Sequence, residues 1–115
     1  MDHKKLDVWK KGIEFVVRVY GVTDSFPKNE IYGLISQLRR AAVSVPSNIA
    51  EGAARSSDKE MAQFLYIAMG SLAETETQLI ISTKLAYLKE DKSILEEVEI
   101  LRKMLMGLIK YLKNK

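Results

Sequence analysis

Five basic residues are the main candidates for binding a ligand in this chain of 115 residues. They fall in two adjacent pairs and one single position: Lys10 and Lys11, Arg39 and Arg40, and Arg55. Lys and Arg neutralise nucleic-acid phosphates and release the counterions condensed on them, so these side chains indicate contact with RNA or DNA. The alternative is that they are solvated, or that the two adjacent Arg residues form ion pairs between subunits with Glu51 or Glu74.

A run of polar residues surrounds Pro46: Ser44, Ser47, Asn48 and Glu51. At 100° per residue they share one side of a helix, and this polar stripe could line a groove or a central opening. The alternative is that Ser and Asn side chains satisfy backbone groups that Pro46 leaves without a partner. We expect this second role for Ser47, at the carbonyl of Ala42. For Asn48 and Glu51, a network between helices or subunits is favoured.

The residue types of this chain do not support catalysis or metal binding. The chain has no Cys, and its one His, His3, lies near the N-terminus. Cys nucleophiles and thiolate metal sites are therefore excluded, and Ser-His-Asp triads and His metal clusters lose nearly all support. Di-iron bundles need Glu-x-x-His pairs, and glycine-rich phosphate loops are absent. We expect a non-enzymatic protein with no catalytic residue, metal, cofactor or small-molecule substrate.

The composition is that of one soluble domain spanning residues 1–115. Hydrophobic residues make up 47% of the chain and charged residues 29%, a balance that argues against disorder. The 18 Lys and Arg exceed the 15 Asp and Glu by three, a mild basic excess. The charged N-terminal segment does not have the pattern of a signal peptide, and the uncharged stretch 61–73 is too short to cross a bilayer. We therefore expect a cytoplasmic protein with no membrane partner.

Two helices are expected in the first half of the chain. The first covers residues 8–25 and is capped by Asp7. Its predicted apolar stripe consists of Trp9, Ile13, Val16 and Tyr20. The second covers residues 29–55. Its amphipathic pattern keeps the same phase across Pro46, so we predict one helix kinked there rather than two. Its predicted apolar side consists of Leu34, Leu38, Ala41, Ala42, Val45, Ile49 and Gly52.

The third helix is expected to begin at a capping box formed by Ser57 and Glu60 and to end near residue 88. Its core seam follows a heptad-like spacing: Met61, Leu65, Ala68, Leu72, Thr75, Leu79, Ser82 and Ala86. A second apolar set lies about 100° around the helix: Ala62, Tyr66, Met69, Ala73 and Ile80. A helix apolar over more than half of its circumference is usually covered on several sides. We therefore predict that the second set contacts another subunit; the alternative is a fully buried central helix in a monomer.

The fourth helix follows the polar turn 89–92, capped by Asp91 or by Ser93, the latter with Glu96 as a capping box. Its apolar seam consists of Ile94, Val98, Leu101, Leu105, Leu108 and Leu112. Four amphipathic helices joined by short connections predict an all-α fold, an antiparallel up-down four-helix bundle.

Three segments resemble one bacterial protein family: LDVWKKGIEFV, FPKNEIYGLISQLRRAAVSVPSNIAEGAAR and FLYIAMGSLAETETQLIIS. This is the four-helix-bundle family encoded in intervening sequences of 23S ribosomal RNA genes, and the motifs keep their order over nearly the whole chain. The family is similar in fold to the accessory variability protein of diversity-generating retroelements. The resemblance implies a homopentamer and an affinity for RNA or DNA.

Two functions are consistent with these observations. The first is a homo-oligomeric binding module, a pentamer by resemblance, that holds RNA or a nucleoprotein partner. The alternative is a protein–protein scaffold without nucleic-acid binding, in which the basic residues serve solubility.

Overall fold

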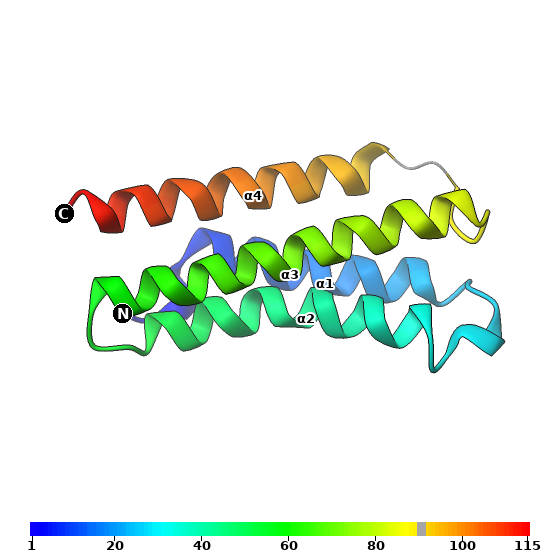
Figure 1. Cartoon of the computed structure of the whole chain (residues 1–115), viewed down its shortest axis with the longest axis horizontal. Coiled ribbons are helices and arrows are strands. Elements are labelled where there is room, and N and C mark those ends of the chain that lie inside the picture. Colours follow the sequence, from blue (N-terminus) through cyan, green and yellow to red (C-terminus); the bar gives the residue numbers. More distant parts are fainter. Residues whose placement is uncertain (90–91) are drawn as a thin grey trace.

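The computed structural model describes residues 1–89 and 92–115. These ranges contain two short 3₁₀ helices and four α-helices: η1 (His3–Lys5), α1 (Asp7–Thr23), η2 (Lys28–Glu30), α2 (Leu34–Ala53), α3 (Asp58–Lys84) and α4 (Lys92–Lys113). Each α-helix packs against the next one in the chain, and α4 also packs against α1 (Figure 1). The predicted antiparallel four-helix bundle is confirmed.

Both termini lie at the same end of the bundle, as Figure 1 shows. We call the half of the bundle nearest the termini the terminal half, made of residues 1–14, 44–71 and 103–115. The remaining described residues form the loop half, which holds the α1–α2 connection and the end of α3. The molecule measures 46 × 24 × 20 Å, so these halves are separated along its long axis. No helix in the described ranges is both long and apolar enough to cross a membrane.

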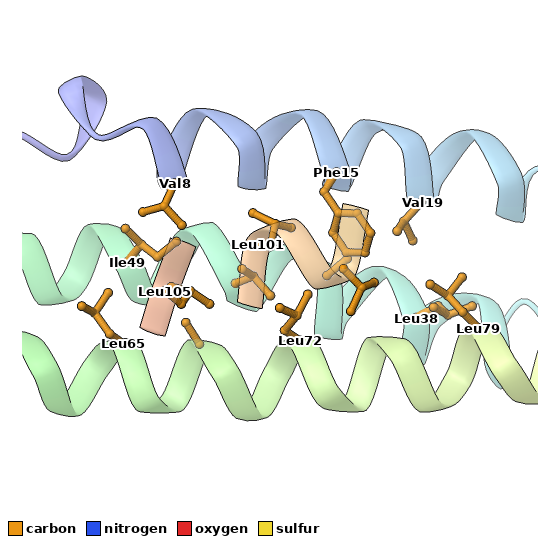
Figure 2. Close-up of a cluster of buried hydrophobic side chains, with 14 of the residues drawn as sticks. Val8, Phe15, Val19, Leu38, Ile49, Leu65, Leu72, Leu79, Leu101 and Leu105 are labelled. Carbon is orange, nitrogen blue, oxygen red and sulfur yellow. The ribbon is translucent and has the colours of Figure 1, made fainter. Parts of the chain in front are cut away.

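Large aliphatic side chains from all four helices fill the centre of the bundle. Figure 2 shows Phe15 from α1 beside leucines of the other helices, with Leu72 and Leu101 close to it. The predicted α3 seam is buried from Met61 through Ser82. In α4, Ile109 is buried where the sequence predicted Leu108, which is half-buried. The core predictions for α3 and α4 are therefore correct except near the helix ends.

The core side of α1 differs from the prediction. Its buried residues are Val8, Gly12, Phe15, Val19 and Thr23. The predicted stripe is therefore wrong: Ile13 and Tyr20 are exposed, while Trp9 and Val16 are half-buried. A Cβ placed on Gly12 would lie 3.4 Å from the Cβ of Pro46, so the two helices approach closely there. The side of α1 that bears Gly12 therefore packs against α2, and the bulky Phe15 and Val19 on that side are buried in the core.

α2 begins later than predicted and then continues without a break. Residues 28–30 form the separate turn η2, and Gly33, with φ −112° and ψ −113°, precedes the first residue of α2. The helix runs through the buried Pro46 to Ala53, which confirms one helix rather than two. The bend at Pro46 stays a prediction. The predicted apolar side is buried except for Leu34, which is half-buried, and Ile35 is buried as well.

The predicted helix caps are only partly correct. Ser57 caps α3 by accepting a hydrogen bond from the backbone N–H of Glu60 at 3.1 Å. The Glu60 carboxylate does not return to the Ser57 backbone; it accepts from the hydroxyls of Ser57 and Ser56 at 3.2 and 3.3 Å. Asp7 is the first residue of α1 rather than its cap, because the N-cap residue is Leu6.

The ends of α3 and α4 near their connection also differ from the prediction. α3 ends at Lys84, and Ala86 adopts a left-handed backbone conformation with φ 63°. The N–H of Tyr87 then donates to the carbonyl of Ser82 at 3.0 Å, which closes the helix as a Schellman motif. α4 begins at Lys92, so Ser93 lies inside it rather than capping it. The predicted cap at Asp91 lies outside the described residues.

Candidate nucleic-acid and subunit interfaces

The side chain of Arg39 makes several contacts within its own chain. Its Nε donates to Thr23 Oγ1 at 2.9 Å, and its guanidinium lies 3.0 Å from an Asp24 carboxylate oxygen. The same group stacks 4.5 Å above the ring of Tyr20. Its carboxylate partner within the chain is thus Asp24, at the end of α1; pairing with Glu51 or Glu74 of another subunit stays a prediction. These contacts tie α2 to the C-terminal end of α1.

Arg40, the next residue, is exposed and makes no ion pair within the described ranges. It borders an open groove of about 440 Å³ between α1 and α2. Exposed apolar side chains of Tyr20, Ile31 and Val43 also line this groove. Two adjacent arginines therefore differ in role: Arg39 is held in place, and Arg40 is available to a partner.

The other three predicted basic residues lie in the terminal half and are exposed. The guanidinium of Arg55 lies 4.5 Å above the ring of Phe64. Lys11 approaches a Glu14 carboxylate oxygen at 3.9 Å, and Lys10 has no ion pair in the described residues. The structure thus places Lys10, Lys11 and Arg55 toward one end of the bundle, and Arg39 and Arg40 in the other half.

Basic residues are concentrated in the terminal half as a whole. Segments 1–14, 44–71 and 103–115 contain ten of the 18 Lys and Arg but only six of the 15 Asp and Glu. Two of these lysines have partners at the terminal end: Lys113 lies 2.8 Å from Tyr66 Oη, and Lys115 lies 3.3 Å from an Asp58 carboxylate oxygen. The remainder of the chain has eight basic and nine acidic residues, so the positive excess belongs to the terminal half.

The polar residues near Pro46 act mainly on their own helix. Ser44 Oγ donates to the carbonyl of Arg40 at 3.0 Å, and Asn48 Nδ2 donates to the carbonyl of Ser44 at 2.8 Å. Ser47 and Glu51 are exposed and make no side-chain hydrogen bond within the described part of the chain. The expectation that Ser47 bonds the freed carbonyl is therefore wrong, and Asn48 satisfies backbone rather than joining helices.

The second apolar set of α3 lies along the contact between α3 and α4. Ala62 is buried, and Met69 packs against the core. Tyr66 meets Lys113 of α4, and Ile80 lines a cavity of about 190 Å³ with Ile94 and Leu95 of α4. Ala73 is exposed. Contact with α4 thus accounts for part of this set, and its contact with another subunit stays a prediction.

A different set of exposed apolar residues was missed by the sequence pattern. On the outer side of α3 are Ile67 and Ile81, which are 51% and 44% exposed. Near the groove, Ile31 is 48% and Tyr32 94% exposed. The sequence could have indicated them, because these residues are apolar but belong to none of the predicted core stripes.

Side-chain contacts in the loop half join elements distant in sequence. Arg18 of α1 contacts Glu97 and Ser93 of α4. A hydrogen bond to Glu30 raises the pKa of Tyr87, and the Tyr87 ring lies 5.8 Å from the Phe26 ring. Among the residues that the structure describes, no group of three His, Cys, Asp or Glu side chains is arranged to hold a metal.

Residues 4–107 match a known protein family described as 23S rRNA-intervening sequence protein. Among solved structures, the chain is similar to a protein of unknown function from the S23 ribosomal protein family of Bacteroides thetaiotaomicron. The two share 24% sequence identity and a TM-score of 0.64, over 91% of this chain and 94% of the other. At this identity, the likeness supports the fold alone. No curated protein matches the chain significantly.

Proposed function

This chain belongs to the 23S rRNA-intervening sequence protein family, and we propose that it is a non-enzymatic homo-oligomer that binds RNA through the basic residues of its terminal half. The observation that carries the proposal is the concentration of Lys and Arg at the end where both termini lie. Lys10, Lys11 and Arg55 are the residues of the predicted set that belong to this surface, whereas Arg39 serves the fold.

Assembly of several chains would repeat the basic surface and so strengthen RNA binding. A single chain has a formal charge of +3, which is weak for a nucleic-acid-binding protein. In a closed ring, symmetry repeats the terminal half of every subunit on the same side. The pentamer implied by family resemblance would present five copies of the basic surface, and RNA spanning several copies would gain affinity from multivalency.

Support for assembly comes from exposed apolar residues. Tyr20, Ile31 and Val43 lie beside one groove, and Ile67 and Ile81 lie on another helix. Large exposed apolar surfaces on soluble proteins commonly mark contacts with other proteins. The same observation favours the second candidate, a protein–protein scaffold in which the basic residues serve only solubility.

The residue types support binding rather than catalysis. The chain offers no Cys, and its single His3 stacks edge-on to Trp9 with ring centroids 5.1 Å apart. A Cys nucleophile is therefore absent, and His3 is the one His available as a general base.

A titration with a fluorescein-labelled RNA stem-loop, followed by fluorescence anisotropy, tests the RNA-binding half of the proposal. We expect binding at about 50 mM salt that weakens steeply at about 200 mM, because phosphate contacts release counterions. No binding at the lower salt would contradict RNA binding. If the nuclease-treated protein were then still an oligomer that captured protein partners, the scaffold would be favoured.

A further inference from the structure

We propose that one copy of this chain places the outer face of its α3 in the α1–α2 groove of the next copy, where Glu74 pairs with Arg40. This inference rests on the homo-oligomer proposed above and names the surfaces that form it. The α3 outer face consists of Ile67, Gly70, Glu74, Thr77 and Ile81, and the groove is lined by Tyr20, Ile31, Arg40 and Val43.

The α3 outer face has the spacing of a helix-packing seam. Its residues follow each other at intervals of three and four, and all five are exposed. Such spacing keeps side chains on one stripe that a partner element can cover. At Gly70, a Cβ would meet no atom within 4 Å, so the stripe is open at its centre. This stripe is distinct from the set facing α4, and no element of the described chain covers it.

The groove offers a complementary surface. Tyr20 comes from α1, Val43 from α2 and Ile31 from the connection between them, so the groove spans two elements. Its volume of about 440 Å³ can accept side chains of a packed helix. An apolar groove receiving an amphipathic helix is a recurring mode of recognition, in which side chains at helical spacing act as anchors.

Charge identifies a second copy as the occupant. Arg40 is the cation of the groove without an acidic partner in the described residues, since Arg39 already binds Asp24. Glu74 is the single charged residue of the α3 outer face, and its carboxylate accepts a hydrogen bond from the neutral amide of Gln78 at 3.4 Å, so it has no cationic partner in the described residues. Each surface thus carries one unsatisfied charge, of opposite sign, between apolar residues. Complementary charges at such positions fix the register of an interface.

The residues of the groove and of the α3 outer face also lie at similar heights along the bundle axis. α2 and α3 leave their shared connection in the same direction, and each residue advances about 1.5 Å along a helix. Among the apolar residues, Val43 then lies about 15 Å and Ile67 about 14 Å from the connection. Among the charged residues, Arg40 lies about 20 Å and Glu74 about 24 Å from it. Copies placed side by side at equal height therefore match apolar with apolar residues and Arg40 with Glu74.

Two different surfaces on one chain produce a heterologous contact. Such a contact either closes into a ring or continues as a filament, whereas an isologous dimer would use one self-complementary surface. The geometry is thus consistent with the cyclic assembly proposed above, and it assigns one surface to each side of every subunit.

Charge reversal tests the pairing directly. The proteins to compare are the wild type, Arg40→Glu, Glu74→Arg and the double variant, each nuclease-treated, by sedimentation velocity over a range of concentrations. We expect each single reversal to weaken association at least about tenfold, because like charges then face each other in the interface. The double variant should recover most of the association. Glu96→Arg, which reverses an exposed acidic residue of α4 outside both surfaces, is the matched control and should associate like the wild type.

The outcomes separate this inference from the proposed function. A wild type that is monomeric at every concentration would overturn both. An oligomer that neither single reversal weakens would overturn the named surfaces and leave the homo-oligomer standing. Weakening by both single variants without recovery in the double variant would overturn the pairing of Arg40 with Glu74. Circular dichroism of each variant, compared at equal concentration, verifies that the helices are intact.

Discussion

The terminal half and the loop half contain ten and eight of the Lys and Arg residues, but these side chains have different surroundings. In the loop half, Arg18 and Arg39 join helices through Glu97 and Asp24. In the terminal half, Lys10 and Arg55 have no carboxylate partner in the described residues, and acidic residues are fewer. The comparison teaches that the number of basic residues says little about binding until their partners are known.

The difference follows from the order of charges in the helices. α4 has its acidic residues early and its basic residues late, so its first turns bring carboxylates to the loop half, where Glu97 contacts Arg18 of α1, and its last turns bring lysines to the terminal half. That order also complements the helix dipole. The late part of α4 and the residues after it thus supply four of the ten basic residues of the terminal half, and residues 4–11, before and at the start of α1, supply another four.

The largest expected effect is on RNA binding by the terminal half. Lys10→Gln, Lys11→Gln and Arg55→Gln combined should weaken binding of the labelled stem-loop at least about tenfold and lower the slope of log affinity against log salt by about 2. Fluorescence anisotropy at several salt concentrations measures both. The matched control changes three loop-half lysines, Lys28, Lys84 and Lys92, to Gln. Equal losses of RNA affinity in the two triple variants would show that the two halves do not differ in RNA binding.

Arg39 tests the structural role assigned to arginines of the loop half. Arg39→Ala removes charge-assisted hydrogen bonds to Thr23 and Asp24, so we expect the free energy of unfolding to fall by about 2 kcal/mol. Arg40→Ala, its exposed neighbour, should change it by less than about 0.5 kcal/mol. Urea denaturation, at a protein concentration where both variants have the same assembly state, gives these values. Similar stability of the two variants would show that Arg39 does not tie α1 to α2.

The ends of α2 and α3 provide a smaller contrast between the halves. Ala86, after α3 in the loop half, has φ 63°, whereas Ala54, after α2 in the terminal half, has φ −81°. A left-handed conformation costs Ala about 1 kcal/mol relative to Gly, so Ala86→Gly should stabilise the protein by about that amount. Ala54→Gly should not stabilise it, because Gly gains nothing in the right-handed region and loses more entropy on folding. Thermal unfolding distinguishes them; destabilisation by Ala86→Gly would contradict the described helix end.

The smallest expected effect concerns an exposed ion pair of α4. A hydrogen bond and the nearby charge of Arg102 lower the pKa of Glu99 from its ordinary value of 4.5. Because the folded-state pKa is lowered, the pair stabilises the fold above pH 4.5, and this contribution is lost as the pH falls through the folded-state pKa. Arg102→Gln should raise the pKa of Glu99 toward its ordinary value, measured by NMR titration of the carboxyl carbon. An unchanged pKa would mean that the pair does not persist in solution.

Helix number, topology and the core seams of α2, α3 and α4 could largely be predicted from the sequence, because long amphipathic periods determine them. Periodicity could not choose between the two apolar stripes of α1, since both have helical spacing and the choice depends on how α1 packs against the other helices. It also did not predict the early end of α3, because Ala at position 86 gives no glycine signal. The candidate basic residues were identified by type, but only the fold separates Arg39 from Arg40, because their roles depend on residues far away in sequence.

The central claim is that copies of this chain assemble and that the assembly carries nucleic acid. The most direct test is the mass of the purified protein in solution by light scattering, with its ultraviolet absorbance spectrum recorded before and after nuclease treatment. We expect a nuclease-resistant oligomer with five times the mass of the 13.1 kDa chain, together with copurifying nucleic acid that the nuclease removes. A 13.1 kDa monomer with the spectrum of protein alone would contradict it.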